Sequence, residues 1–195
     1  MADAATTSPA TAESLHRTAL FEAVRAVGAR MVPFGGWEMP VQFSGLVREH
    51  EAVRHHCGVF DISHMGVFTL RGEGVKERMQ RLVPSDLFRI GPGEACYTVL
   101  LNDQGGIRDD LIIYDRGRRT DPDDADGRES DELLIVINAA CAELDISWIS
   151  GQLEPEGIRL RDRKGDGVLL ALQGPEAAAH LEVLAGASLS GLPRF

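Results

Sequence analysis

The sequence is short of positive charge. It has 20 Lys and Arg residues against 30 Asp and Glu residues, which gives a formal net charge of −10. Sequence-independent nucleic-acid binding and attachment to an anionic membrane surface both need a basic face, so the composition argues against both. Long apolar runs are also missing, because none approaches the roughly 20 residues that span a bilayer.

The first fourteen residues, 1–14, contain no Lys or Arg and are rich in Ala, Thr and Ser. They lack the basic start and apolar middle of a signal peptide and the arginines of a transit peptide, so we expect a disordered leader. Cysteine is scarce as well. Cys57, Cys96 and Cys141 are odd in number and far apart, which favours reduced thiols in a cytoplasmic protein over a disulfide framework.

What the sequence does contain is ample core material, since 44% of its 195 residues are hydrophobic. The most informative stretch has two apolar runs, Tyr97–Leu101 and Leu111–Tyr114, on either side of the polar segment Asn102–Gly106. Paired glycines allow positive φ, so this pattern predicts a β-hairpin with a loop longer than two residues.

Two adjacent carboxylates, Asp109 and Asp110, stand where the second strand of this hairpin begins. Asp is depleted in strands, and strand alternation sends neighbouring side chains to opposite faces. Either both residues end the loop, or one is solvated and the other points inward. An inward carboxylate beside apolar walls needs a hydrogen-bond partner or a ligand.

Two further patterns resemble catalytic motifs but fail on geometry. His50 and His55 flank a Glu as in a zinc protease, but with one residue too many, which places them about 140° apart on a helix. Asp61, Ser63 and His64 are chain neighbours, and neighbours cannot adopt the geometry of a catalytic triad together. We therefore expect no metal site. By itself Met65, which leads into a predicted strand, is typical of core packing.

Residues 115–132 contain eight acids and four arginines and almost nothing apolar. This composition predicts a solvated insert whose replacement by a short turn changes stability by no more than about 1 kcal/mol.

The last third predicts strands and helices in the order β-α-β-β-α, which is a ferredoxin-like unit without its final strand. The sequence therefore predicts an α+β fold with two parts. Residues 15–132 form an antiparallel-sheet domain, and residues 133–195 form the incomplete ferredoxin-like unit.

Six short segments in order make the chain resemble the T-protein family of the glycine cleavage system, which are aminomethyltransferases. The segments are Gly28–Pro40, Glu49–Arg54, Phe60–Met65, Leu101–Tyr114, Val136–Asn138 and Leu172–Pro175. The resemblance covers about residue 18 to the end, and it is to the N-terminal portion of the family. The later family motifs are absent, so we expect a fragment or one part of a split gene, with a separate C-terminal half as a partner.

The resemblance implies a folate-binding domain and transfer of an aminomethyl group. In the family this group passes from the lipoyl arm of a carrier protein, the H protein, to tetrahydrofolate, and ammonia leaves. The resemblance makes Asp109 the essential carboxylate beside the pterin, where an anion can stabilise cationic charge as C–N bonds rearrange. It also implies that Met65 packs on the pterin, that Tyr97 lines the pocket and that Asn138 hydrogen-bonds near the ring.

Two alternatives within the same superfamily remain. One is a non-enzymatic folate-binding protein of iron–sulfur assembly, and the other is a folate-dependent demethylating domain. The intact Asp109 and Phe60–Met65 segments favour the transferase. Demethylating domains are usually fused to a flavin domain, and no dinucleotide fingerprint is present here.

Overall fold

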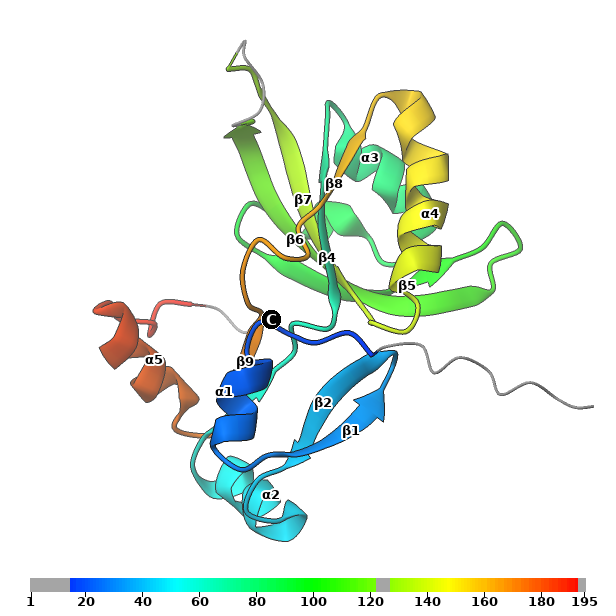
Figure 1. Ribbon diagram of the computed structural model, residues 1–195. Coiled ribbons are helices and arrows are strands. Elements are labelled where there is room, and N and C mark those ends of the chain that lie inside the picture. The colour runs from blue at the N-terminus through cyan, green and yellow to red at the C-terminus, as the bar shows by residue number, and fades with distance from the viewer. Residues whose placement is uncertain (1–14, 122–126, 193–195) are drawn as a thin grey trace, which may run out of the picture.

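The computed structural model describes residues 15–121 and 127–192, so the expected leader lies outside the described residues. Its centre is an antiparallel five-stranded sheet in the order β5-β6-β7-β4-β8 (Figure 1). The strands are β4 (Gly66–Arg71), β5 (Ala95–Leu101), β6 (Ile107–Thr120), β7 (Glu129–Ile137) and β8 (Arg159–Asp162). The predicted α+β class with antiparallel sheets is confirmed.

One face of this sheet forms the core. Side chains that alternate along β4, β6 and β7 are fully or nearly fully buried, as the period of two requires: Phe68, Leu70, Leu111, Ile113, Leu133, Ile135 and Ile137. They form a single cluster with apolar residues of the helices that cover them. These are α3 (Val75–Met79) and α4 (Ala142–Leu153), with short 3₁₀ turns η1 (Gln80–Leu82), η2 (Leu87–Arg89) and η3 (Glu154–Glu156). Each large side chain buried in this way contributes about 1.5–3 kcal/mol.

The predicted hairpin is present as β5 and β6, which pair antiparallel from Ala95↔Tyr114 to Leu101↔Ile107. Asn102 closes the turn, because its side-chain oxygen accepts the backbone N–H groups of Gln104 and Gly106 at 3.0 and 2.8 Å. The register shifts between Leu100 and Leu101. Arg108 is therefore the extra residue of a β-bulge immediately before Asp109.

The structure corrects the expectation of a solvated insert for the two ends of residues 115–132, and residues 122–126 lie outside the described residues. The two ends of this segment are the extensions of β6 and β7, which pair as far as Thr120↔Glu129. Asp115 and Glu132 are buried, and both carboxylates form ion pairs, with Lys76 and with Arg71 and Arg116. The boundary at 132/133 falls inside a single strand, because β7 runs from Glu129 to Ile137.

The ferredoxin-like unit over residues 133–195 is not formed as predicted. The order β-α-β-β-α occurs, but β4 lies between β7 and β8, and β9 (Leu170–Gln173) pairs with β3 (Gly58–Asp61) in a separate sheet. Residues 164–167 therefore lie in a connection between two sheets. A split β-α-β arrangement does exist, but it begins at β4 and runs through α3, β6, β7 and α4 to β8.

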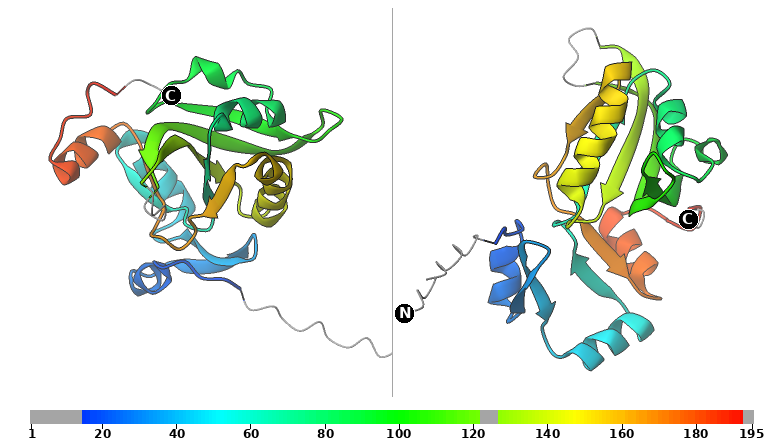
Figure 2. Two further views of the ribbon diagram at one scale, coloured as in Figure 1. Left: turned by 90° about the horizontal axis from the view of Figure 1, so that it is seen from above. Right: turned by 90° about the vertical axis from the view of Figure 1, so that its right-hand side faces the viewer.

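The remaining elements lie below the five-stranded sheet in Figure 1 and in the right-hand view of Figure 2. They are α1 (Phe21–Ala26), β1 (Arg30–Phe34), β2 (Trp37–Gln42), α2 (Leu46–His55), β3, β9 and α5 (Ala177–Ala185). β1 and β2 form a two-stranded antiparallel hairpin. Neither α2 nor α5 has a buried residue. Among the described residues, no helix has both the length and the apolar character needed to cross a membrane.

Candidate functional site

Asp109 is held at the start of β6 by a residue from the neighbouring strand. Asn138 follows the last residue of β7, and its side-chain Nδ2 donates to Asp109 Oδ1 at 3.0 Å and to the backbone oxygen of Asp110 at 3.2 Å. Leu111 pairs with Ile137, so the sheet register itself brings Asn138 next to the two acids. The position of the Asp109 carboxylate is therefore fixed by backbone pairing.

Asp110 faces away from Asp109. Its carboxylate accepts a hydrogen bond of 2.9 Å from the hydroxyl of Tyr97, whose side chain is largely exposed. This hydrogen bond, with the negative charge of Asp110, raises the pKa of Tyr97. The structure thus shows the expected alternation, with Asp109 beside Asn138 on one side and Asp110 beside Tyr97 on the other.

Met65 lies next to the end of β7, because the residue after it, Gly66, pairs with Ile137, which precedes Asn138. It precedes β4 and lines a cavity of ≈ 260 Å³ together with Val67, Lys164 and Val168, and neither Asp109 nor Asn138 lines this cavity. Of the four residues that the family resemblance singles out, Asp109 and Asn138 are joined by a hydrogen bond, Tyr97 is hydrogen-bonded to Asp110, and Met65 lies in the cavity beside β4.

Sequence reasoning missed the residues of α4 that face Asp109. One oxygen of Asp109, one oxygen of Asp145 and the Cys141 sulfur all lie within 4.8 Å of one another. Asp145 is only 2% exposed and belongs to the buried stripe of α4 with Ile149 and Leu153. The signal in the sequence was the spacing of Asp145, Ile149 and Leu153 at i, i+4 and i+8, which puts an acid on the same helix face as two apolar residues. A charged residue on such a core-facing stripe is rarely found without a partner.

Burial dominates the electrostatics of this cluster. Burial, together with a hydrogen bond to Asp109 and the charge of Asp109, raises the pKa of Asp145 to about 7, and the nearby Arg108 opposes this shift. Burial likewise raises the pKa of the Cys141 thiol, with the charges of Asp109 and Asp145 adding to the effect.

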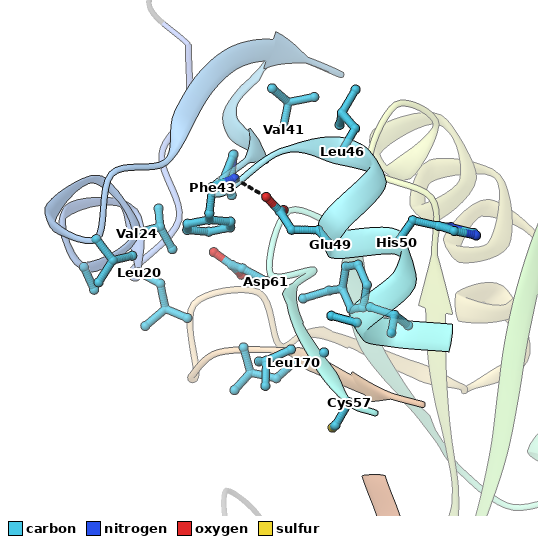
Figure 3. A pocket seen from close by; sticks show the side chains of 18 residues that line it. Leu20, Val24, Val41, Phe43, Leu46, Glu49, His50, Cys57, Asp61 and Leu170 are labelled. Carbon is cyan, nitrogen blue, oxygen red and sulfur yellow. Dashed lines mark hydrogen bonds between the residues drawn. The ribbon is translucent and has the colours of Figure 1, made fainter. Parts of the chain in front are cut away.

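A second region is a large apolar cavity of ≈ 780 Å³ between α1, α2, β3 and β9 (Figure 3). Its labelled wall residues include Leu20, Val24, Val41, Phe43 and Leu46.

One carboxylate shapes the rim of this cavity. Glu49 Oε1 accepts the backbone N–H groups of Phe43, Ser44 and Gly45 at 2.7, 2.6 and 2.8 Å, and the first of these contacts is drawn in Figure 3. These hydrogen bonds, Phe43 first, lower the pKa of Glu49. A carboxylate thereby fixes the loop before α2.

Most of the chain matches one family. The GCVT N-terminal domain family matches residues 20–193. The chain belongs to this family. Named relatives agree with it: the chain is 64% identical to the aminomethyltransferase of Synechococcus sp. (strain RCC307), over 91% of this chain and 46% of the relative. It is 60% identical to that of Synechococcus sp. (strain WH7803), over 93% of this chain and 48% of the relative.

A solved structure of the GCVT family has the same fold. The glycine cleavage system aminomethyltransferase T from Bartonella henselae superposes with a TM-score of 0.77 at 32% identity, over 92% of this chain and 46% of that chain. The predicted family is confirmed. The chain spans about half the length of these relatives.

Proposed function

We propose that this chain provides the carboxylate side of the site of a tetrahydrofolate-dependent aminomethyltransferase. The observation that carries the proposal is the Asp109–Asn138 pair, built into the sheet register of a chain that matches aminomethyltransferases over more than nine-tenths of its length. A cytoplasmic location, which the three free cysteines favour, is part of the proposal.

The side chains at Asp109 fit a pterin. A carboxylate offers about four lone pairs, and Asn138 donates only one hydrogen bond to the Asp109 carboxylate. Asp109 Oδ1 thus keeps acceptor capacity for an N–H group of the ring, whereas Oδ2 is buried. The residue is half-buried, where a charge acts more strongly than in water. Asn138 is in contact with Asp109 and is the second residue we assign to the pterin. The roles of Met65 and Tyr97 toward the pterin remain predictions from the family resemblance.

Tetrahydrofolate accepts the one-carbon unit, and a lipoyl carrier protein is the proposed donor. This chain contributes electrostatic stabilisation to the reaction. The Asp109 anion stabilises cationic charge that develops as C–N bonds rearrange, and Asn138 keeps that anion in a fixed place before the reaction begins. Neither residue needs to remove a proton.

The apolar cavity between α1, α2, β3 and β9 suggests a second component. Its walls carry exposed apolar side chains such as Phe43, Leu46 and Leu170, and α2 has no buried residue. Apolar surface of this extent normally has a partner. We propose that the later half of the family's length, in the same or a separate chain, packs here, and that this chain without it binds tetrahydrofolate weakly.

The test compares Asp109→Asn with Asp110→Asn, two isosteric changes at adjacent positions. The variants are assayed in the chain combined with the later half of a Synechococcus relative. We expect Asp109→Asn to lower aminomethyl transfer by orders of magnitude and Asp110→Asn to do far less, because only the carboxylate of Asp109 accepts a hydrogen bond from Asn138.

The control is unchanged far-UV circular dichroism of both variants. Equal loss from the two substitutions would contradict the assignment of Asp109. Tight tetrahydrofolate binding without any transfer would favour a folate-binding protein without enzymatic activity.

A further inference from the structure

Lysine occurs at only two positions in this chain, Lys76 and Lys164, although the chain has 20 basic residues. Lys76 is paired with the buried carboxylate of Asp115. Lys164 is held in another way: its Nζ donates to the backbone oxygen of His64 at 2.9 Å and lies 4.5 Å from the centre of the Trp37 ring. Ordering a long lysine side chain costs conformational entropy, so a half-buried lysine fixed by an uncharged oxygen and an aromatic ring needs a structural reason.

The oxygen that Lys164 binds belongs to the turn that carries Met65. Met65 N donates to the backbone oxygen of Ile62 at 3.0 Å and closes this turn. Ser63 ties the turn to the connection that contains Lys164, since Leu169 N donates to Ser63 Oγ at 3.0 Å and Ser63 Oγ donates to the Leu169 oxygen at 3.3 Å. Ser63, Met65 and Lys164 all line the cavity of ≈ 260 Å³ beside β4. The hydrogen bond of Lys164 therefore holds the carbonyl directly before Met65 on the wall of that cavity.

The tip of the β1–β2 hairpin packs on both partners of this hydrogen bond. Phe34 and Trp37 pair with each other at the end of the hairpin. The Phe34 ring meets the His64 ring edge-on, with 5.7 Å between the ring centres, and the Trp37 ring lies beneath Lys164 Nζ. A cation at this distance from an indole face is attracted to it, most of all where water is excluded. Burial lowers the pKa of Lys164, which agrees with an ammonium group partly removed from water.

We propose that Lys164 is a positioning residue, which fixes the turn before β4 so that Met65 presents its side chain to the pterin of tetrahydrofolate. The proposal rests on the proposed function, in which tetrahydrofolate binds and Met65 packs on its ring. Lys164 acts through the backbone of His64 and Met65 and not through its charge on the ligand. Without Lys164 the turn populates further conformations, and the apparent affinity falls in proportion to the fraction of molecules in which Met65 is in place.

The direct test is NMR of the 195-residue chain without folate. Labelling of the lysine ε-carbons gives two signals, and labelling of the methionine methyl groups gives five, of which Met65→Leu assigns one. We expect a nuclear Overhauser effect between the ε-protons of Lys164 and the Trp37 ring, because the ring lies beneath Nζ. We also expect Lys164→Gln to shift and narrow the Met65 methyl signal, as a freer side chain requires, and to leave the signal of fully buried Met79 in place.

The matched control is Arg163→Gln. Arg163 is the chain neighbour of Lys164 and lines the same cavity, but its guanidinium pairs with Asp166 within the connection. Loss of this charge should leave the Met65 signal unchanged.

The second measurement is tetrahydrofolate binding by the chain combined with the later half of a Synechococcus relative. We expect Lys164→Gln to weaken binding about tenfold, which corresponds to about one molecule in ten with Met65 in place. Lys164→Arg should restore most of the affinity, because a guanidinium also donates to a backbone oxygen and also lies favourably over an indole ring. Arg163→Gln should bind like the unmodified protein.

Absence of the Lys164–Trp37 Overhauser effect in the unmodified chain would overturn the proposal, and this measurement needs no variant to fold. Equal weakening by Arg163→Gln and Lys164→Gln would also overturn it, because the positive charge of the cavity and not the turn would then matter. So would weak binding by Lys164→Gln with an unchanged Met65 signal, which would indicate direct contact between Lys164 and the ligand. Absence of tetrahydrofolate binding by the unmodified combined protein, with the NMR results as expected, would instead refute the proposed function.

Discussion

Glu132 is the residue whose change should most clearly test the corrected view of the acidic segment. It lies in β7 opposite Arg71 of β4 and is 4% exposed. Its Oε2 accepts two hydrogen bonds from the Arg71 guanidinium, one of them from Nε at 3.1 Å. Its Oε1 lies 2.9 Å from Arg116 Nη1. One carboxylate thus neutralises two guanidinium groups at the edge of the core.

Glu132→Gln keeps the size of the side chain and removes its charge. Breaking a buried ion pair by removing one partner costs about 3–5 kcal/mol, because the other charge stays buried. Two features place this case at the lower end of that range. Arg71 keeps a hydrogen bond of 2.8 Å to the backbone oxygen of Arg119, and Arg116 is 31% exposed, so water can solvate it. We expect a loss of about 3 kcal/mol.

The assay is urea unfolding followed by far-UV circular dichroism, and the control is Asp131→Asn. Asp131 is the chain neighbour of Glu132, but its side chain is 41% exposed and lies 3.8 Å from Arg118. Exposed pairs of this kind contribute about 0–1 kcal/mol and are screened by salt. The Glu132 effect should persist in high salt. Equal effects of the two substitutions would refute the reasoning, because they would mean that Arg71 has access to water.

Three further predictions use the same unfolding assay. Gly174→Ala should lower the free energy of unfolding by at least about 3 kcal/mol, because a Cβ at this position, where φ is +126°, would stand 2.4 Å from the backbone oxygen of His56. Gly165→Ala is the comparison, since Gly165 also has a positive φ but faces open space, and it should lower the free energy of unfolding by less. Ile149→Ala, fully buried on α4, should cost about 2–5 kcal/mol. Asp145 keeps its proton in the folded chain up to about pH 7, against an ordinary pKa of 3.8, so stability should fall as pH rises from about 4 to 7, and Asp145→Asn should flatten this decline.

The local order of residues in the sequence was enough to predict several structural features of this protein. The hairpin around Asn102–Gly106 follows from turn chemistry between two apolar runs, and the opposite directions of Asp109 and Asp110 follow from the period of a strand. Both depend on residues that are close in the sequence, where backbone geometry leaves few choices.

The amino-acid composition led to a wrong prediction where a high density of charged residues was taken to mean solvent exposure. Eight acids in residues 115–132 predicted a solvated insert, yet Asp115 and Glu132 are buried, because basic side chains of β4, α3 and β6 meet them. Charged residues are buried only with partners. Two of these partners, Arg71 and Lys76, lie about forty or more residues away along the chain.

The strands that pair with each other in a sheet are determined only by the tertiary structure. The placement of β4 between β7 and β8, and of β9 beside β3, joins segments up to about a hundred residues apart, and nothing in a strand's own residues names its partner. The Asp109–Asp145 pair has the same origin. Helical spacing puts Asp145 on the apolar stripe of α4, but only the packing of that stripe against β6 brings a second carboxyl to it.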